Sequence, residues 1–149
     1  MIMTNHITKL LNLEDVIITN VENISGQLHI YLELPRKKHV CPCCGAETAC
    51  IHDYRVQIIK DIPMARDTFL HLRKRRYRCA CGKRFFEKNS FLPRYFRVTI
   101  RLFAEIIFAF KKIVSAKEIG CRFNVSAVTA MRYFNFFNKK LTVLPEVIS

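Results

Sequence analysis

Two short cysteine clusters constrain the fold of this chain more than any other feature. Cys41 and Cys44 form a Cys-x-x-Cys pair followed by glycine, and Cys79 and Cys81 form a second cluster, also followed by glycine. Thiolates spaced in this way can hold one tetrahedral Zn²⁺ ion at about 2.3 Å, and the glycines let backbone amides turn towards the sulfurs. We therefore expect these four cysteines to bind a structural zinc, with strands of a ribbon between the clusters.

The ligand set has alternatives at this stage. The second cluster is Cys-x-Cys, one residue shorter than the usual Cys-x-x-Cys, so Cys43, Cys50 or His52 is an alternative ligand. Buried free thiols or a redox pair are further interpretations of the same cysteines. A catalytic zinc is disfavoured, because four thiolates leave no open coordination position and no general base lies nearby in the sequence.

Positive charge is concentrated around and after the second cysteine cluster. The chain has a formal net charge of +13, and the segment from Arg66 to Arg101 has twelve Lys and Arg residues against two acids. Aromatic residues interrupt this segment, which indicates a folded surface rather than a loose tail. A field of that strength attracts polyanions and releases their counterions on binding. We expect double-stranded DNA as the partner, and the alternative is a solvated surface that only aids solubility.

Four segments before the second cysteine cluster have the composition of β-strands. Val16–Val21 and Gln27–Leu34 flank turn-forming residues and predict a hairpin. Arg55–Lys60 and Thr68–Tyr77 predict two further strands, and the second of these carries the basic residues. Residues 7–11 are expected to form a helical turn.

From Arg97 onwards the hydrophobic period changes from that of a strand to that of a helix. Apolar residues recur three and four positions apart between Phe103 and Ile113, which predicts an amphipathic helix. Two more helices are expected, one over Ala116–Phe123 and one from Ser126 to about residue 138.

The last two expected helices have the features of a helix-turn-helix. Gly120 is small where the helices would cross, Asn124 suits a left-handed turn, and Ser126 can cap the second helix. In such a motif the second helix lies in the DNA major groove, whereas the alternative is an ordinary helical hairpin in a core. The residues expected to contact DNA from this motif are Arg122, Ser126, Ala127, Thr129 and Arg132. Those expected to contact phosphates from the basic strand and the second cysteine cluster are Arg73, Lys74, Arg75, Arg76, Lys83 and Arg84.

These expectations define an α+β chain in which a small zinc-ribbon β part precedes an all-α helix-turn-helix domain. The expected limits are residues 1–40 for an N-terminal hairpin region, 41–92 for the zinc ribbon and 93–143 for the helical domain. The sequence has no run of about 20 consecutive apolar residues that would span a membrane, and its start lacks a signal-peptide pattern. We expect a cytoplasmic protein without a membrane partner, either monomeric or a homodimer.

The order of these motifs resembles the N-terminal half of insertion-sequence transposases of the ISL-three family. The resemblance extends over about residues 10–149, and its most specific part is the run Arg75-Arg76-Tyr77-Arg78-Cys79 followed by Cys81-Gly82-Lys83-Arg84-Phe85-Phe86-Glu87. It implies a zinc ribbon and a helix-turn-helix that recognise the terminal inverted repeats of a transposon. In that family an RNase-H-like domain with three acidic residues follows and uses divalent metal to cut and join DNA.

The resemblance also implies a role for this chain. Residues 144–149 resemble the segment just before the catalytic domain, so we expect a chain that is truncated there, lacks the acidic triad and is not itself an enzyme. One alternative is a stand-alone helix-turn-helix transcriptional regulator or transposition repressor with the same surfaces. Two further alternatives for its function are a nuclease with an unrecognised active site and a zinc ribbon that binds RNA or protein.

Overall fold

A computed structural model describes residues 8, 9, 11, 13, 15–92, 96–112 and 115–141. The strands are β1 (Ile17–Ile24), β2 (Gln27–Glu33), β3 (His39–Val40), β4 (Glu47–Thr48), β5 (Ile51–Asp61), β6 (Thr68–Arg78) and β7 (Arg84–Phe86). The helices are α2 (Ile100–Phe110), α3 (Ala116–Phe123) and α4 (Ala127–Leu141). The α+β class expected from the sequence is confirmed.

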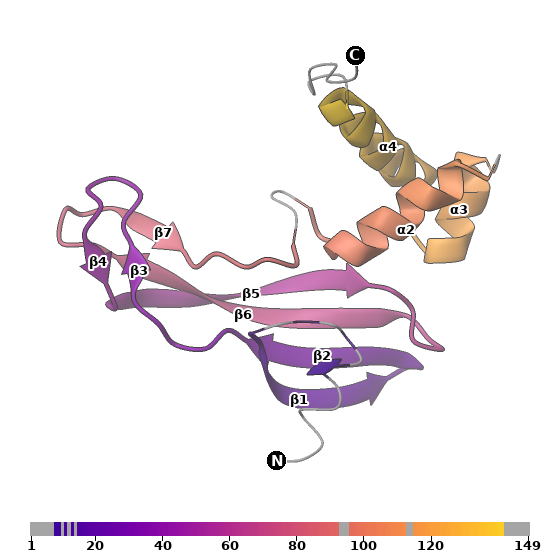
Figure 1. Ribbon diagram of the computed structural model, residues 1–149. Coiled ribbons are helices and arrows are strands. Elements are labelled where there is room, and N and C mark those ends of the chain that lie inside the picture. The colour runs from indigo at the N-terminus through magenta and orange to yellow at the C-terminus, as the bar shows by residue number, and fades with distance from the viewer. Residues whose placement is uncertain are drawn as a thin grey trace.

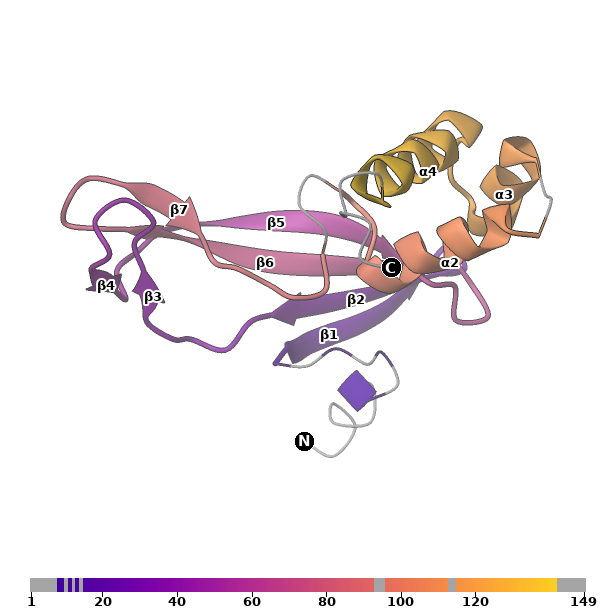
Figure 2. The ribbon, with the colours of Figure 1, turned by 45° about the horizontal axis from the view of Figure 1, so that its top comes forward.

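The long strands β5 and β6 connect two ends of the molecule. Figures 1 and 2 show the helices at one end of these strands and β3, β4 and β7 at the other. The main sheet has the strand order β1-β2-β6-β5, and β7 pairs with the far part of β6. The short strands β3 and β4 form a separate two-stranded ribbon. The structure therefore separates the cysteine clusters from the helices by the length of an 11-residue strand.

The N-terminal hairpin predicted from the sequence is present. β1 and β2 pair antiparallel, and the last pair before the turn is Ile24 with Gln27. The two turn residues, Ser25 and Gly26, have positive φ angles, of 51° and 78° respectively. Two such residues make the tight turn whose twist matches that of paired strands. The other two predicted strands lie inside β5 and β6, which also pair antiparallel.

The hairpin is joined to the rest of the sheet by a parallel pairing that the sequence did not indicate. β2 runs alongside β6 from the Leu28–Thr68 pair to the Glu33–Arg73 pair. One sheet therefore contains strands from both segment 1–40 and segment 41–92. Its buried face is apolar, and residues before β1 and after β7 cover it; the core residues are Leu11, Leu13, Ile18, Ile30, Leu32, Leu34, Ile59, Leu70, Leu72 and Phe91.

The helices enclose a second, separate core. Its buried members are Phe96, Val98, Leu102, Ile106, Ile107, Ala109, Ile119, Phe123, Ala130 and Tyr133. Thr99 and Ser115 cap α2 and α3, because their hydroxyls accept the amides of Leu102 and Glu118. No helix of the described ranges has the length and apolarity to cross a membrane.

The connection between α3 and α4 is short and tight. Asn124 has φ 50° and ψ 49°, the left-handed conformation expected from the sequence. At Gly120 an added Cβ would lie 2.7 Å from the Val125 carbonyl oxygen, so this position has no room for a side chain. The α3–α4 pair thus depends on one glycine and one left-handed residue.

A buried carboxylate joins the sheet to the helices. Asp61 ends β5 with no exposed surface, and its Oδ1 accepts the Thr99 hydroxyl at 2.7 Å and the Arg101 Nε–H at 2.7 Å. A second Arg101 nitrogen contacts Asp61 Oδ2, and a third donates to the Leu11 carbonyl. Because Thr99 and Arg101 flank the first residue of α2, this carboxylate fixes the start of that helix on the sheet.

Backbone and loop contacts reinforce this junction. The Lys60 amide donates to the Arg97 carbonyl at 2.8 Å, and the Thr99 amide donates to the Lys60 carbonyl at 3.0 Å. The Lys60 ammonium donates to the Asn124 backbone carbonyl at 2.6 Å, while the side-chain Nδ2 of Asn124 donates to Asp67 Oδ2 at 2.7 Å. The α3–α4 turn is therefore attached directly to the β5–β6 end of the sheet.

Some expectations fall on residues outside the described ranges. Thr8, Lys9 and Leu11 are helical, but the other residues of the turn expected over 7–11 are not described. The same holds for Ile113 of the predicted amphipathic helix and for residues 144–149.

Replacing Asp61 by alanine should destabilise the whole protein. The change leaves Thr99 and Arg101 without their buried acceptor, and we expect a loss of about 2–3 kcal/mol in the free energy of unfolding. Asp53→Ala removes a carboxylate whose partner Arg76 lies on a partly exposed surface, so we expect a loss below about 1 kcal/mol. Urea unfolding of the zinc-loaded protein measures both, and equal losses would contradict the role given to Asp61.

Gly120→Ala should disturb the α3–α4 turn although alanine is the better helix former by roughly 1 kcal/mol. The new methyl group meets a backbone carbonyl that cannot rotate away, so we expect a net loss of about 1–3 kcal/mol. Cys121→Ala, at the exposed neighbouring position, is the control and should change stability little. A thermal midpoint for Gly120→Ala equal to that of the control would refute the close approach.

Candidate metal centre and nucleic-acid surface

The two cysteine clusters lie in two tight turns that face each other. Cys41 follows β3, where its amide donates to the Ala46 carbonyl at 2.8 Å and Gly45 turns with φ 73°. Cys79 follows β6, where its amide donates to the Lys83 carbonyl at 2.9 Å and Gly82 turns with φ 86°. Each glycine adopts a conformation that other residues rarely reach. The turns bring together sulfurs that are far apart in the sequence.

The four sulfurs of Cys41, Cys44, Cys79 and Cys81 have the spacing of a tetrahedral zinc site. All of them lie within 4.8 Å of one another, with 3.7 Å between Cys41 and Cys81 and 3.4 Å between Cys44 and Cys79. Zn–S bonds of about 2.3 Å in tetrahedral geometry require sulfurs about 3.8 Å apart. The cluster can therefore bind one structural Zn²⁺ ion.

Backbone amides and neighbouring sulfurs shift the pKa values of Cys41 and Cys81 strongly, in opposite directions. The Cys44 amide contributes most to lowering the pKa of Cys41 to about 7. At Cys81 the Lys83 amide lowers the pKa, but desolvation and hydrogen bonds with the other three cysteines outweigh it and raise the pKa to about 12. Because four adjacent thiolates repel one another, holding all of them deprotonated requires a bound cation.

The shorter spacing of the second cluster is compatible with this geometry. The Cys79–Lys83 turn places both Cys79 and Cys81 within reach of Cys41 and Cys44. The alternatives left open by the sequence, namely Cys43, Cys50 and His52, do not belong to the four-residue group found among the described residues. Cys43 lies between two members of the group in the sequence, but it is not among the cysteines whose sulfurs all lie within 4.8 Å of one another.

The surroundings of this cluster match a known protein family. Residues 37–82 match the family described as the zinc-finger of transposase IS204/IS1001/IS1096/IS1165. The segment 37–82, which holds all four cysteines of the cluster and the whole of β6, is therefore similar to the zinc ribbon of these transposases.

A curated relative supports the same assignment. The transposase for insertion sequence element IS1001 of Bordetella parapertussis is 38% identical over 83 residues, which cover 54% of this chain. The match covers only 20% of that transposase, so the chain spans about a fifth of the relative. A search of solved structures gave no match.

The basic residues of β6 alternate between the two faces of the sheet. Lys74 and Arg76 lie on the face of Phe86, with each cation within 6 Å of that ring centroid, at 5.3 and 5.9 Å. Arg73 lies on the opposite face, over the Tyr54 ring at 4.1 Å and 3.9 Å from Glu33. The expected phosphate-contacting residues of this strand therefore do not form one surface.

Arg75 is enclosed rather than offered to a partner. Its side chain is 3% exposed, and its guanidinium donates to the Leu34 carbonyl and pairs with Glu87 at 3.3 Å and Glu33 at 3.4 Å. The expectation that Arg75 contacts DNA is corrected by this burial. Sequence reasoning missed it because Glu87, which neutralises Arg75, lies on the far side of the second cysteine turn.

Near the zinc cluster, cations face one another across strands. Arg78 pairs directly with Arg84 in the β6–β7 register, and both side chains are exposed, as is Lys83. Like charges placed opposite each other destabilise a strand pair. An anion bound there would relieve the repulsion.

The expected DNA-contacting residues of the helices lie around the start of α4. Ser126 caps α4, since its hydroxyl accepts the Thr129 amide at 3.0 Å and contacts the Thr129 hydroxyl at 2.8 Å. Ala127 is half-buried, whereas Arg122 and Arg132 are exposed. Sequence reasoning missed Val128, whose side chain is 78% exposed at the free face of the helix.

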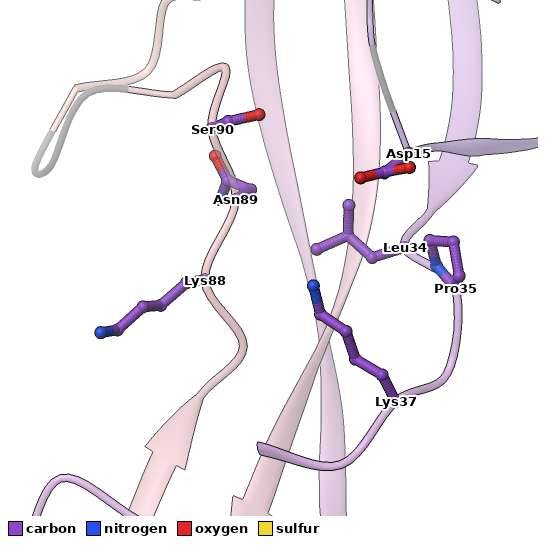
Figure 3. Close-up of a pocket in the computed structure, with 7 residues that line it drawn as sticks. All are labelled: Asp15, Leu34, Pro35, Lys37, Lys88, Asn89 and Ser90. Carbon is purple, nitrogen blue, oxygen red and sulfur yellow. The ribbon is translucent and has the colours of Figure 1, made fainter. Parts of the chain in front are cut away.

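A separate hollow of about 480 Å³ lies beside the end of β2 and is shown in Figure 3. Lys37 and Lys88 line it together with Asp15, and Figure 3 shows the Lys88 side chain pointing away from Leu34. Since one carboxylate partly balances the two cations, this hollow is a weaker anion site than the unpaired cations near the cysteine turns.

Replacing Cys79 by serine should abolish zinc binding. A serine hydroxyl is a poor zinc ligand, so we expect purified Cys79→Ser to hold less than about a tenth of the metal of the wild type and to lose ordered structure at the cysteine end. Cys43→Ser changes the same atom at an exposed position within the first cluster and should retain one zinc per chain. Metal analysis by mass spectrometry distinguishes the two, and metal loss in Cys43→Ser would contradict the ligand set.

Zinc affinity should fall as the pH is lowered. Below its pKa of about 7 the Cys41 thiol is protonated in the absence of metal, and it must release that proton to bind zinc. We therefore expect a weaker zinc affinity at about pH 6 than at about pH 8, with proton release on binding, measured by competition with a chromophoric chelator. An affinity independent of pH would contradict ligation by thiolates.

Proposed function

We propose that this chain binds double-stranded DNA and recognises the terminal inverted repeats of an insertion sequence, as the DNA-binding portion of a transposase. The observation that carries the proposal is the exposed face of α4, held beside α3 by a short left-handed turn, in a chain whose zinc ribbon is that of transposases. The IS1001 transposase to which it is similar acts on an insertion sequence by name.

The α3–α4 pair is proposed to be a helix-turn-helix with α4 as the recognition helix. Gly120 and Asn124 give the close approach and sharp turn that such a motif needs. Val128, Arg132 and Asn135 then lie along one exposed face at helical spacing. An apolar residue can contact the thymine methyl group, arginine pairs with guanine and asparagine with adenine, so this face has the chemistry for reading bases.

Phosphate contacts are proposed at both ends of the sheet. At the α4 end, Ser126 and Thr129 lie at a helix N-terminus, which favours anions, and Arg122 is exposed nearby. At the zinc end, exposed Lys83 and Arg84 supply unpaired positive charge. The homodimer expected from the sequence stays a prediction that the mass of the DNA complex would test.

We further propose that the described residues bind DNA without cutting it. Among the described residues, the one group of His, Cys, Asp or Glu side chains placed to hold a metal ion is the four-cysteine cluster, and Glu33, Asp53, Asp61, Asp67 and Glu87 each pair with a lysine or arginine. Duplex DNA incubated with the purified protein and Mg²⁺ or Mn²⁺ should remain intact. Metal-dependent cleavage would favour the nuclease alternative.

Val128→Glu should abolish DNA binding without disturbing the fold. The new carboxylate would lie on the proposed groove-reading face and repel phosphates, while the high exposure of Val128 means that no core contact is lost. Phe108→Glu makes the same change of charge at a 56% exposed position of α2 and is the control. Fluorescence anisotropy should show at least a tenfold weaker affinity for Val128→Glu and less than a threefold change for the control, both as order-of-magnitude expectations.

Recognition of the repeats is tested by competition. The element's own terminal-repeat duplex should outcompete a scrambled duplex of the same length and composition by about a hundredfold or more at physiological salt. Equal affinity for the two duplexes would remove the claim of repeat recognition and leave a general DNA-binding role.

A further inference from the structure

A groove of about 400 Å³ runs along β5, the strand at the free edge of the main sheet. Its lining comes from β5, β6, β7 and the segment before α2, so it lies between the zinc end and the helices. The lining residues are Arg55, Val56, Gln57, Ile58, Lys74, Phe86 and Arg97.

Three cations reach this groove from three different segments of the chain. Arg55 of β5 and Lys74 of β6 are directly paired in the sheet register and therefore lie on the same face. Arg97 precedes α2, and its backbone is held against β5 by the hydrogen bond from the Lys60 amide at 2.8 Å. The fold thus places three positive charges together that are separated in the sequence.

Within the described residues, these cations differ from Lys60, Arg73, Arg75 and Arg76 of the long strands in having no ion-pair partner. Among the described residues, the ion pairs involve Lys60, Arg73, Arg75, Arg76 and Arg101, but none of Arg55, Lys74 or Arg97. Lys74 is half-buried against the Phe86 ring, and burial lowers its pKa while Glu87 opposes the shift. A half-buried ammonium without a carboxylate gains more from a bound anion than an exposed one does.

One wall of the groove is apolar as well as cationic. The Phe86 ring is 38% exposed and lies on the same face as Lys74. Val56 and Ile58 also border the groove, but they alternate with Arg55 along β5, so their side chains point to the opposite face. A free inorganic anion gains nothing from an aromatic ring, whereas a nucleotide unit presents a phosphate together with the apolar faces of a sugar. The combination therefore matches the sugar–phosphate backbone of a nucleic acid.

We infer that this groove binds a backbone phosphate of duplex DNA, independently of sequence, between the contacts made by the zinc end and those made by α4. The inference rests on the proposed function, because it takes duplex DNA as the partner. Arg55, Lys74 and Arg97 clamp the phosphate, and the Phe86 ring contacts the adjoining deoxyribose. The groove adds affinity and fixes the path of the duplex, while α4 supplies the selectivity.

Lys74→Gln and Arg97→Gln test this inference singly in the full chain. Each should weaken binding of the terminal-repeat duplex and of the scrambled duplex by the same factor, because the lost contact carries no sequence information. Each should also lower the slope of log affinity against log salt concentration by about one. Arg97 is exposed and its structural hydrogen bond uses the backbone, so its substitution should leave the fold intact.

Arg36→Gln is the matched control. This exposed arginine donates to the Tyr54 hydroxyl at 3.2 Å, and Tyr54 points to the face opposite that of its neighbour Arg55. The variant removes one positive charge from the same half of the sheet and should leave the salt slope unchanged. Equal zinc content and thermal midpoints for all variants establish that only the contact has changed.

The outcomes separate the groove from the proposed function. If Lys74→Gln and Arg97→Gln keep the wild-type salt slope while Val128→Glu still abolishes binding, the groove does not bind DNA and the role of α4 stands. If the wild type does not prefer the terminal repeats, repeat recognition fails, yet the salt slopes on the scrambled duplex still decide whether the groove contacts phosphate. A loss of affinity confined to the terminal repeats would overturn the sequence-independent role of the groove.

Discussion

The buried carboxylate of Asp61 is the interaction on which the arrangement of this protein depends. A charged group without exposed surface is costly unless its hydrogen-bonding capacity is filled, and here Thr99 and Arg101 fill it. Both partners belong to the start of α2, so satisfying the charge requires the helices to sit at one position on the sheet. Among the described residues the two cores are separate clusters, so the polar contacts of this junction help to fix their relative placement.

The junction gives the long strands a mechanical role. β5 and β6 run without interruption from the cysteine turns to the helices, and the α3–α4 turn is attached to them through Lys60 and Asn124. Because paired strands are stiff along their length, the distance between the zinc end and α4 is set by the sheet. A DNA duplex that contacts both ends would then meet them at one fixed spacing, which a flexible linker would not provide.

The cations of this chain divide into two groups with different physical roles. Arg75 and Arg101 hold the protein together, because each pairs with a fully buried carboxylate; their own side chains are 3% and 26% exposed. Others, such as Lys83, Arg84 and Arg97, are exposed and lie outside the ion pairs found in the described ranges. The net charge of +13 is therefore divided between cations that stabilise the fold through ion pairs and exposed cations that are available to a partner.

Local features of the fold were predictable from the sequence, whereas long-range pairings were not. Hydrophobic spacing indicated β1, β2, β5, β6 and the helices, and the cysteine spacing indicated the metal cluster. The burial of Arg75 was not predictable, because β6 buries Leu70 and Leu72 on one face but Arg75 and Tyr77 on the other. The face of β6 that is covered by other segments differs between its two ends. The alternation of residues within a single strand does not show which face other segments will cover. The role of Asp61 was not predictable either, since its partners follow about forty residues later.

The parallel pairing of β2 with β6 has a consequence for the order of assembly during synthesis. Leu28 meets Thr68 only after about forty further residues have emerged, whereas the β1–β2 hairpin is complete at once. Until then the hairpin presents an unpaired strand edge and one apolar face to its surroundings, which is the condition in which nascent chains associate wrongly. Binding of the ion by both cysteine turns would hold the end of β6 near the first cluster. β6 would then have a shorter distance to search before it pairs with β2.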